Sequence, residues 1–168
     1  MSSRPPLPAS LLRADLERAG FVGWQTWDEL RATNYARVPA GPAVYVVYRS
    51  RVEPVFLDAN AGGRFKGRDP SVAAEKLKAK WVTGAHTIYI GKADVANRRL
   101  MEFARFGAGE PVAHWGGRYI WQVDGIDELL VAWHMIAWDE SAREYEKRLL
   151  AHFCGRHDRH RPFANLTG

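Results

Sequence analysis

The sequence predicts a mixed α/β domain of the α+β kind, with a small and mostly antiparallel central sheet flanked by helices. The run Ala43–Tyr48 is β-branched and aromatic, which is typical of a central strand. Two further strands are expected at Arg118–Val123 and Leu129–Trp138, with a turn region at Asp124-Gly125 between them. Helix-capping signals lie between and around these strands, so helices are expected to cover the sheet.

The first 40 residues are expected to form an N-terminal helical extension, and residues 41–168 the main domain. Ser10 suits the N-cap of a helix over Leu11–Ala19. Thr26-Trp27-Asp28-Glu29 fits a capping box at the start of a short second helix. The prolines that follow, before the first strand, then break the chain.

The first half of the main domain contains two further strands and a helix. A short strand is expected at Val55–Leu57, before a glycine-rich basic loop from Ala61 to Asp69. Asp69-Pro70 offers an N-cap and a first-turn proline for a helix that ends at about Val82. The next strand is expected at Thr87–Gly91.

The second half adds two longer helices to the predicted strand pair. The first is expected over Val95–Phe106, and the segment Gly107–Gly117 after it is expected to be a loop. Ser141-Ala142-Arg143-Glu144 fits a second capping box, which starts a helix that ends near Gly155. A basic and irregular tail follows.

Composition narrows the classes of function. The 168 residues carry a net charge of +5 and 12% aromatic residues, which favours a polyanionic partner without proving one. Cys154 is the only cysteine, so an internal disulfide and a thiolate zinc cluster are excluded, and a reducing compartment fits best. The sequence shows no signal-peptide pattern and no run of roughly 20 apolar residues. We therefore expect a soluble cytoplasmic protein without a membrane span.

A carboxylate occupies an unexpected place on the last predicted helix. Glu146 lies three, four and seven residues before Leu149, Leu150 and Phe153, so it shares their apolar face. A carboxylate at the inner edge of a helix is costly unless it is paired or binds a cation. Two interpretations stay open: a rim position or salt bridge to an arginine, and an oxygen ligand for Mg²⁺ or Mn²⁺.

The two arginines of the helix Val95–Phe106 differ in their helical phase. Arg99 lies three residues after Ala96 and four before Phe103, at the edge of the apolar stripe, so it can reach inward. Arg98 points elsewhere and can pair with Glu102 at the i, i+4 spacing. Arg99 is thus a candidate to reach into a cleft. The alternative is that its side chain lies along apolar surface with its head in water.

Four more residues are candidates for a functional site. Tyr45 and Tyr89 lie in predicted strands, where a tyrosine usually serves packing. Lys92 follows a glycine at a strand end, from which a short loop can bring it to a ligand; a surface lysine is the alternative. His114 is a candidate catalytic group, or it orders the glycine-rich loop around it.

Basic residues form candidate phosphate-binding patches, for which solvated surface charge is the alternative. The candidates for nucleic-acid contact are Arg64, Lys66, Arg68, Arg118, Arg156 and Arg159. A zinc site from Cys154, His157 and His160 is disfavoured, because one thiol at a helix end makes a poor tetrahedral set.

Several of these residues fall into motifs that resemble the GIY-YIG nuclease superfamily. Ala43-Val44-Tyr45, preceded by Gly41, resembles the first signature, and Tyr89-Ile90-Gly91 matches the second letter for letter. The arginine that this family places ten residues after the second tyrosine falls on Arg99. The family's metal-binding glutamate, in an E-x-x-L-I-like context, falls on Glu146 of Glu146–Leu150.

The resemblance covers about residues 41–165 and includes the family's late asparagine, which falls on Asn165. The run Tyr89–Leu100, with Lys92, is most similar to the UvrC type of DNA repair nuclease. Ala43 departs from the family by replacing the first signature glycine. The spacing between the signatures implies an insertion at about residues 51–85. In this respect the chain is similar to restriction-type members of the family.

The resemblance implies a single GIY-YIG-like domain that acts as an endonuclease. It would hydrolyse nucleic-acid phosphodiesters, with DNA favoured over RNA, and would use one Mg²⁺ or Mn²⁺. The resemblance also implies that Glu146 binds the metal, Arg99 stabilises the transition state, and Tyr89 orients or deprotonates water. These three residues would be supported by Tyr45, Lys92 and Asn165. The alternatives are a nucleic-acid-binding module without turnover and a structural domain with an Arg99–Glu146 salt bridge.

Overall fold

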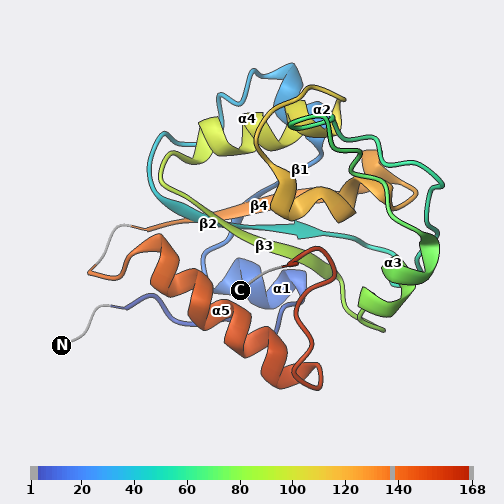
Figure 1. Ribbon diagram of the computed structural model, residues 1–168. Coiled ribbons are helices and arrows are strands. Elements are labelled where there is room, and N and C mark those ends of the chain that lie inside the picture. The colour runs from blue at the N-terminus through green and yellow to red at the C-terminus, as the bar shows by residue number, and fades with distance from the viewer. Residues whose placement is uncertain (1–3, 137–138, 167–168) are drawn as a thin grey trace.

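The computed structural model describes residues 4–136 and 139–166, and its centre is an antiparallel sheet (Figure 1). Four strands, β1 (Val22–Gln25), β2 (Ala43–Tyr48), β3 (Thr87–Ala93) and β4 (Leu130–Met135), pair in the order β1-β4-β2-β3. Helices pack against this sheet, so the chain is a single α+β domain and the predicted fold class is confirmed. The predicted strand end at Trp138 lies outside the described residues.

β2 is buried along its whole length because helices cover both faces of the sheet. Tyr45 and Val47 belong to one apolar core, whereas Val44 and Val46 belong to the other. Successive residues of a strand point to opposite faces, so a strand between two helical layers needs apolar residues at every position. The continuous apolar run in the sequence therefore predicted the central strand correctly.

Two helical layers enclose the sheet (Figure 1). α1 (Arg13–Arg18) and α5 (Ala142–Arg156) lie on one face. The other face carries α2 (Trp27–Ala32), α4 (Ala96–Gly107) and the 3₁₀ helix η1 (Trp115–Gln122). The short elements α3 (Ala74–Lys80) and η2 (Ile126–Glu128) complete the fold. No helix of residues 4–136 and 139–166 is long and apolar enough to cross a membrane.

The two predicted capping boxes are confirmed. Thr26 Oγ1 accepts a hydrogen bond from the Glu29 backbone N–H at 3.2 Å, and the Glu29 carboxylate accepts one from the Thr26 N–H. Ser141 and Glu144 make the same reciprocal pair at the start of α5. The second box matters for function, because it fixes where α5 begins and so the phase at which Glu146 meets the sheet.

Two strand predictions were wrong. The segment predicted as a strand over Arg118–Val123 is mostly the helix η1, which leaves only Val123 in an isolated bridge with Phe56. Tyr119, Ile120 and Trp121 are all buried, so their apolar run reflects burial on all sides and not a strand. The predicted strand Val55–Leu57 is likewise reduced to this isolated bridge at Phe56, with backbone hydrogen bonds that join Val55 and Leu57 to the residues on either side of Val123.

The strand β1 was not predicted from the sequence. It contains two residues with positive φ, Gly23 at 104° and Trp24 at 55°, and its pairing with β4 shifts register between Gly23 and Gln25. A Cβ at Gly23 would lie 2.4 Å from the Trp133 ring, so this glycine makes room for a cross-strand tryptophan. A bulged strand of four residues lacks the alternation by which strands are recognised.

Two helix starts were also wrong. α1 begins at Arg13 with Leu12 as N-cap, and the Ser10 hydroxyl instead bonds to the Asp15 carboxylate. α3 begins at Ala74, because the Asp69 carboxylate accepts a hydrogen bond from the Ser71 N–H and forms a local turn. In both cases the polar residue satisfies a nearby group other than a helix end.

The predicted insertion, residues 51–85, is hydrogen-bonded to η1 through the fully buried Gln122. The Gln122 amide nitrogen donates to the carbonyls of Leu57 and Val72 at 3.0 and 2.8 Å. Its amide oxygen accepts from the Val72 N–H at 3.0 Å. The Asn60 side chain adds a 2.7 Å bond to the Arg118 carbonyl. These contacts make the segment an integral part of the layer that supports η1.

We expect Gln122→Glu to loosen this segment. The carboxylate can still accept from Val72, but both carbonyl partners lose their donor, and an unsatisfied buried polar group costs about 1–3 kcal/mol. Chemical denaturation should show reduced unfolding free energy, and limited proteolysis should cut first within residues 51–85. The exposed Lys76→Ala variant is the control. Cleavage at the wild-type rate would contradict this account.

Candidate active site

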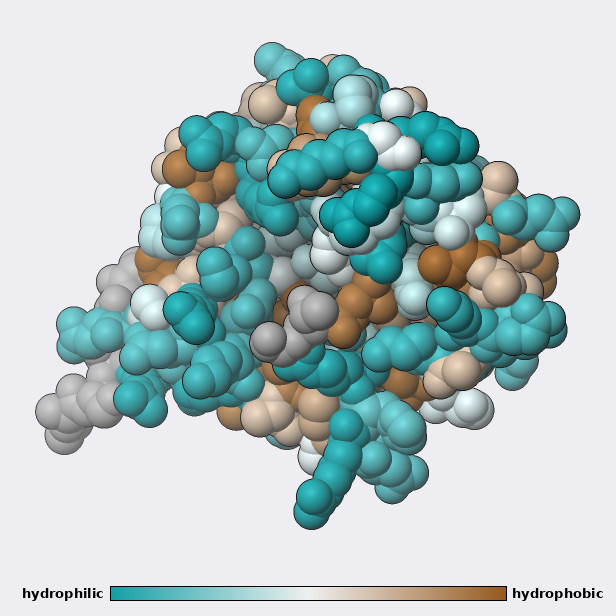
Figure 2. Space-filling view, in the orientation of Figure 1, coloured by the Kyte–Doolittle hydropathy of each residue, from teal (hydrophilic) through white to brown (hydrophobic). Residues whose placement is uncertain are grey.

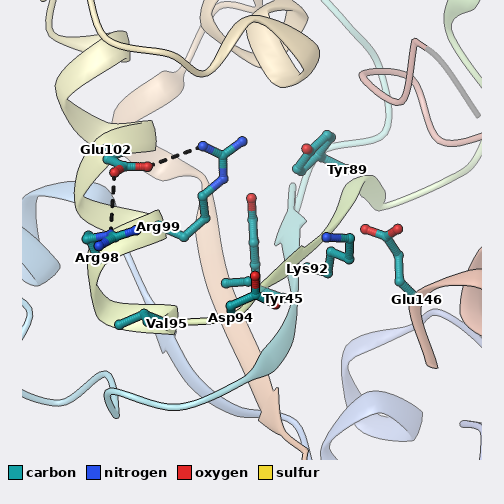
Figure 3. Close-up of a pocket in the computed structure, with 10 residues that line it drawn as sticks. Tyr45, Tyr89, Lys92, Asp94, Val95, Arg98, Arg99, Glu102 and Glu146 are labelled. Atoms are coloured by element: carbon teal, nitrogen blue, oxygen red, sulfur yellow. Dashed lines mark hydrogen bonds and ion pairs between the residues drawn. The ribbon is translucent and has the colours of Figure 1, made fainter. Parts of the chain in front are cut away.

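A cavity of about 420 Å³ opens beside the edge strand β3, between α4 and α5 (Figure 3). Five of the residues predicted to be catalytic line it: Tyr45, Tyr89, Lys92, Arg99 and Glu146. They come from β2, β3, α4 and α5, so residues that are 101 positions apart in the chain meet at one sheet edge. His114 and Asn165 support the cavity from outside its lining.

The pairing of β2 with β3 sets the position of the two tyrosines. Tyr45 and Gly91 are Cα partners across the two strands, and the side chains of Tyr45 and Tyr89 point to the α4 face of the sheet. A Cβ at Gly91 would lie 2.5 Å from Cζ of Tyr45 and 2.8 Å from Cε1 of Tyr89. The glycine of the Tyr89-Ile90-Gly91 motif therefore leaves the space that the two phenol rings occupy.

Lys92 points to the opposite face of the sheet. It pairs with Val44, which belongs to the α5-side core, and its amine faces the Glu146 carboxylate (Figure 3). Because β3 is an edge strand, groups from its two faces can meet around the edge. The cavity thus combines the tyrosines of one face with Lys92 and Glu146 of the other.

His114 lies behind Tyr45 and fixes its orientation. The His114 Nε2 and the Tyr45 hydroxyl are 3.2 Å apart, and the imidazole stacks on Phe103 with ring centroids at 3.5 Å. Burial, together with the charge of Arg99, holds the pKa of His114 well below its usual 6.5, so the imidazole is neutral at pH 7. The structure therefore makes His114 a positioning group for Tyr45.

Arg99 enters the cavity from α4, as its helical phase predicted. Its Nη1 donates to the Ala113 carbonyl at 3.0 Å and lies 3.3 Å from Glu102 Oε2. Glu102 also pairs with Arg98 at 3.7 Å, which confirms the expected i, i+4 contact (Figure 3). The adjacent residues Ala113 and His114 thus hold Arg99 and Tyr45 respectively, which gives the loop before η1 a direct role in the site.

Glu146 reaches the cavity from the sheet-facing side of α5. Burial raises the pKa of its carboxyl above the ordinary 4.5, although the charges of Lys92, Arg161 and Arg143 act in the opposite direction. Within the described part of the chain, this carboxylate forms no hydrogen bond or ion pair. A half-buried carboxylate without a direct partner is suited to hold a cation.

The phenols of the cavity are held in their neutral form. Burial raises the pKa of Tyr45 well above 10, and burial also raises the pKa of Tyr89. The charge of Arg99 lowers both pKa values but does not overcome the desolvation. At neutral pH the two hydroxyls can donate hydrogen bonds to an anionic ligand.

Asn165 is hydrogen-bonded to the outer edge of β3. Its Oδ1 accepts from the Ile90 N–H at 3.0 Å, and its Nδ2 donates to the Ile90 carbonyl at 2.8 Å. Both ends of the amide are thereby used on the backbone between Tyr89 and Gly91. Asn165 fixes the strand that carries the motif, and this contact leaves its amide committed to the protein.

The basic residues predicted to contact nucleic acid do not gather at the cavity. Arg64 pairs with Asp69, and Arg156 lies beside α1 in a separate hollow. The guanidinium carbons of Arg68 and Arg118 lie 4.7 and 4.6 Å from the Trp115 ring centroid. Lys66 and Arg159 are exposed. Among the described residues, none of the six predicted contacts lines the 420 Å³ cavity.

Two basic residues beside Glu146, Arg143 and Lys147, were not predicted from the sequence. Arg143, Lys147 and Arg161 line a second hollow together with Glu146. Arg143 and Lys147 lie at i−3 and i+1 from Glu146 on α5, and the i−3 spacing is a signal that could have identified Arg143. Arg161 lay within the basic tail, but only its fold shows that it turns back to the site.

We expect Gly91→Ala to displace both tyrosines. The added methyl group would lie 2.5 Å from the Tyr45 ring, and overpacking of this kind costs about 1–3 kcal/mol. Chemical denaturation measures the loss, and near-ultraviolet circular dichroism reports the aromatic environment. Gly155→Ala is the matched control, since nothing lies within 4 Å of its Cβ, and it should not destabilise. Equal effects of both changes would contradict the packing argument.

We expect Glu146→Gln to be more stable than the wild type at neutral pH. The folded-state pKa of Glu146 is raised, so ionisation costs more in the folded chain than in the unfolded chain. That cost is fully present above the folded-state pKa and vanishes below 4.5, where both states are protonated.

Thermal unfolding across pH therefore tests the environment of Glu146 without any activity assay. The stability gain of Glu146→Gln should shrink as the pH falls toward 4.5. The exposed Glu75→Gln serves as the control. A gain that is the same at all pH values would refute the burial of a charged Glu146.

Comparison with known proteins gives no match for this chain. No protein-family model, no curated protein and no solved structure matches it. The function proposed for the site therefore depends on its geometry and on the motifs in the sequence.

Proposed function

We propose that this chain is a metal-dependent endonuclease that hydrolyses phosphodiester bonds of nucleic acids, in the manner of the GIY-YIG nucleases that its motifs resemble. The observation that supports this most strongly is the convergence of Arg99 and Glu146 on one cavity with Tyr45, Tyr89 and Lys92. A phosphodiester needs donors for its anionic oxygens and stabilisation of charge in the transition state.

Arg99 is the group proposed to stabilise the transition state. Its guanidinium is held by the Ala113 carbonyl and Glu102 at the cavity wall, so little side-chain freedom is lost when an anion binds. Arginine matches phosphate oxygens with two parallel hydrogen bonds. Arg99 would therefore bind the non-bridging oxygens as their charge increases.

The tyrosines are proposed to position the phosphate and the attacking water. Tyr89 would orient the water, since its raised pKa makes the phenol a poor base on its own. Tyr45 would donate to a phosphate oxygen or to Tyr89 from the orientation that His114 imposes. Lys92, which faces Glu146, would supply positive charge near the leaving oxygen (Figure 3).

Glu146 is proposed to hold one Mg²⁺ or Mn²⁺. It fits a hard divalent cation because it is an oxygen donor that faces the cavity without a direct partner. The described residues contain no group of three His, Cys, Asp or Glu side chains that could hold a metal ion, so substrate oxygens and water would complete the coordination. A bound ion would act as a Lewis acid on the phosphate.

A nucleic-acid-binding module without turnover is the alternative function. The position of Glu146 argues against it, because a carboxylate repels phosphate unless a cation lies between them. The third interpretation, a structural Arg99–Glu146 salt bridge, is not what the structure contains: Arg99 pairs with Glu102 instead.

Cleavage of labelled DNA and RNA with Mg²⁺, Mn²⁺ or EDTA tests the proposal. We expect cleavage, of DNA in preference to RNA, only with the divalent ions, and none from Glu146→Gln. Arg99→Lys should lower kcat by about 10²–10³, the usual effect of removing one transition-state donor. Arg105→Lys, at an exposed position of the same helix outside the cavity lining, is the control. Full activity of Glu146→Gln would exclude this mechanism.

A further inference from the structure

A second hollow of about 380 Å³ adjoins the cavity. It lies between β3, α5 and the C-terminal segment, and the two spaces share Tyr89, Lys92 and Glu146. A ligand that crosses these three residues can therefore occupy both spaces. Glu146 lies at the junction and not at the end of a closed pocket.

The second hollow has a strongly basic wall. Four cations line it, namely Lys92, Arg143, Lys147 and Arg161, against the single acid Glu146. Within residues 4–136 and 139–166, none of the four makes a side-chain hydrogen bond or an ion pair. By contrast, Arg148 on the same helix pairs with Glu140 at 2.6 Å. Figure 2 shows that hydrophilic side chains predominate over α5 on this face.

The same hollow has an apolar part. Ile90, Leu150 and Leu166 contribute to its lining, and Gly116 adds backbone without a side chain. Unpaired cations beside apolar surface suit a ligand that carries both phosphate and less polar groups. A nucleotide chain has this character, whereas inorganic phosphate would use only the cations.

We infer that the second hollow binds the nucleic-acid strand on the far side of the scissile phosphate, with Arg143, Lys147 and Arg161 contacting its backbone. This inference rests on the proposed function. It deepens that function, since it assigns to Arg143, Lys147 and Arg161 the strand that continues beyond the cleaved bond.

Binding measured in EDTA tests the hollow separately from catalysis. The double variant Lys147→Ala/Arg161→Ala should bind a fluorescein-labelled oligonucleotide at least tenfold more weakly than the wild type in anisotropy titrations. The slope of log affinity against log salt concentration should also become less steep. For each phosphate that the variant no longer neutralises, the slope should change by about 0.7 on single-stranded and by about 0.9 on duplex nucleic acid.

Lys76→Ala/Lys78→Ala removes the same two charges from the exposed surface of α3 and is the matched control. Equal losses in the two double variants would overturn the inference, since they would show only a general effect of net charge. Lys147→Glu provides a second variant at an exposed position if loss of Arg161 disturbs the C-terminal segment. Unchanged binding by Lys147→Glu would likewise count against the hollow.

Competition experiments distinguish the class of ligand. An unlabelled oligonucleotide should displace the probe, whereas a mononucleotide or inorganic phosphate should do so only at far higher concentration. Displacement by polyglutamate as effective as that by DNA would overturn the assignment to nucleic acid. If the wild type binds tightly through the hollow but never cleaves, the nuclease function is refuted and the binding role of the hollow stands. If the wild type cleaves and the hollow variants have no effect, the binding role of the hollow is refuted and the nuclease function stands.

Discussion

The antiparallel pairing of Tyr45 with Gly91 is the constraint on which the rest of the site depends. It places a large ring opposite a residue without a side chain, and the two phenols fill the space that a Cβ would take. One register step away, Val44 and Lys92 face the other side of the sheet. A slip of β3 by one residue would send Tyr89 to the α5 face and Lys92 to the α4 face, so the geometry of the site depends on the strand register.

The loop before η1 gives the site its rigidity. Ala113 and His114 are neighbours in the chain, yet one binds Arg99 of α4 and the other binds Tyr45 of β2. The buried Gln122 joins η1 in turn to the segment 51–85. The segment 51–85 separates the two sequence motifs. It therefore supports the loop whose residues hold Arg99 and Tyr45.

Local patterns in the sequence predicted what depends on local structure. Helical phase separated Arg99 from Arg98 and placed Glu146 on an inner face, because periodicity within one helix fixes the direction of a side chain. It could not show that the tail returns Arg161 to the site and leaves Arg156 beside α1, since this depends on how the chain folds back. The predicted strand at Arg118–Val123 failed for a related reason: burial from all sides produces an apolar run in a 3₁₀ helix as well as in a strand.

The C-terminal segment has a consequence for association between molecules. An unpaired edge strand offers its backbone groups to any extended chain, which is a common route to aggregation. Here Asn165 occupies both backbone groups of Ile90, and the Ala164 N–H occupies the Ile88 carbonyl. Ala164 and Asn165 thus occupy the outer edge of β3 in the way that a neighbouring strand would. They protect the sheet from intermolecular β-addition at the same edge that borders the cavity.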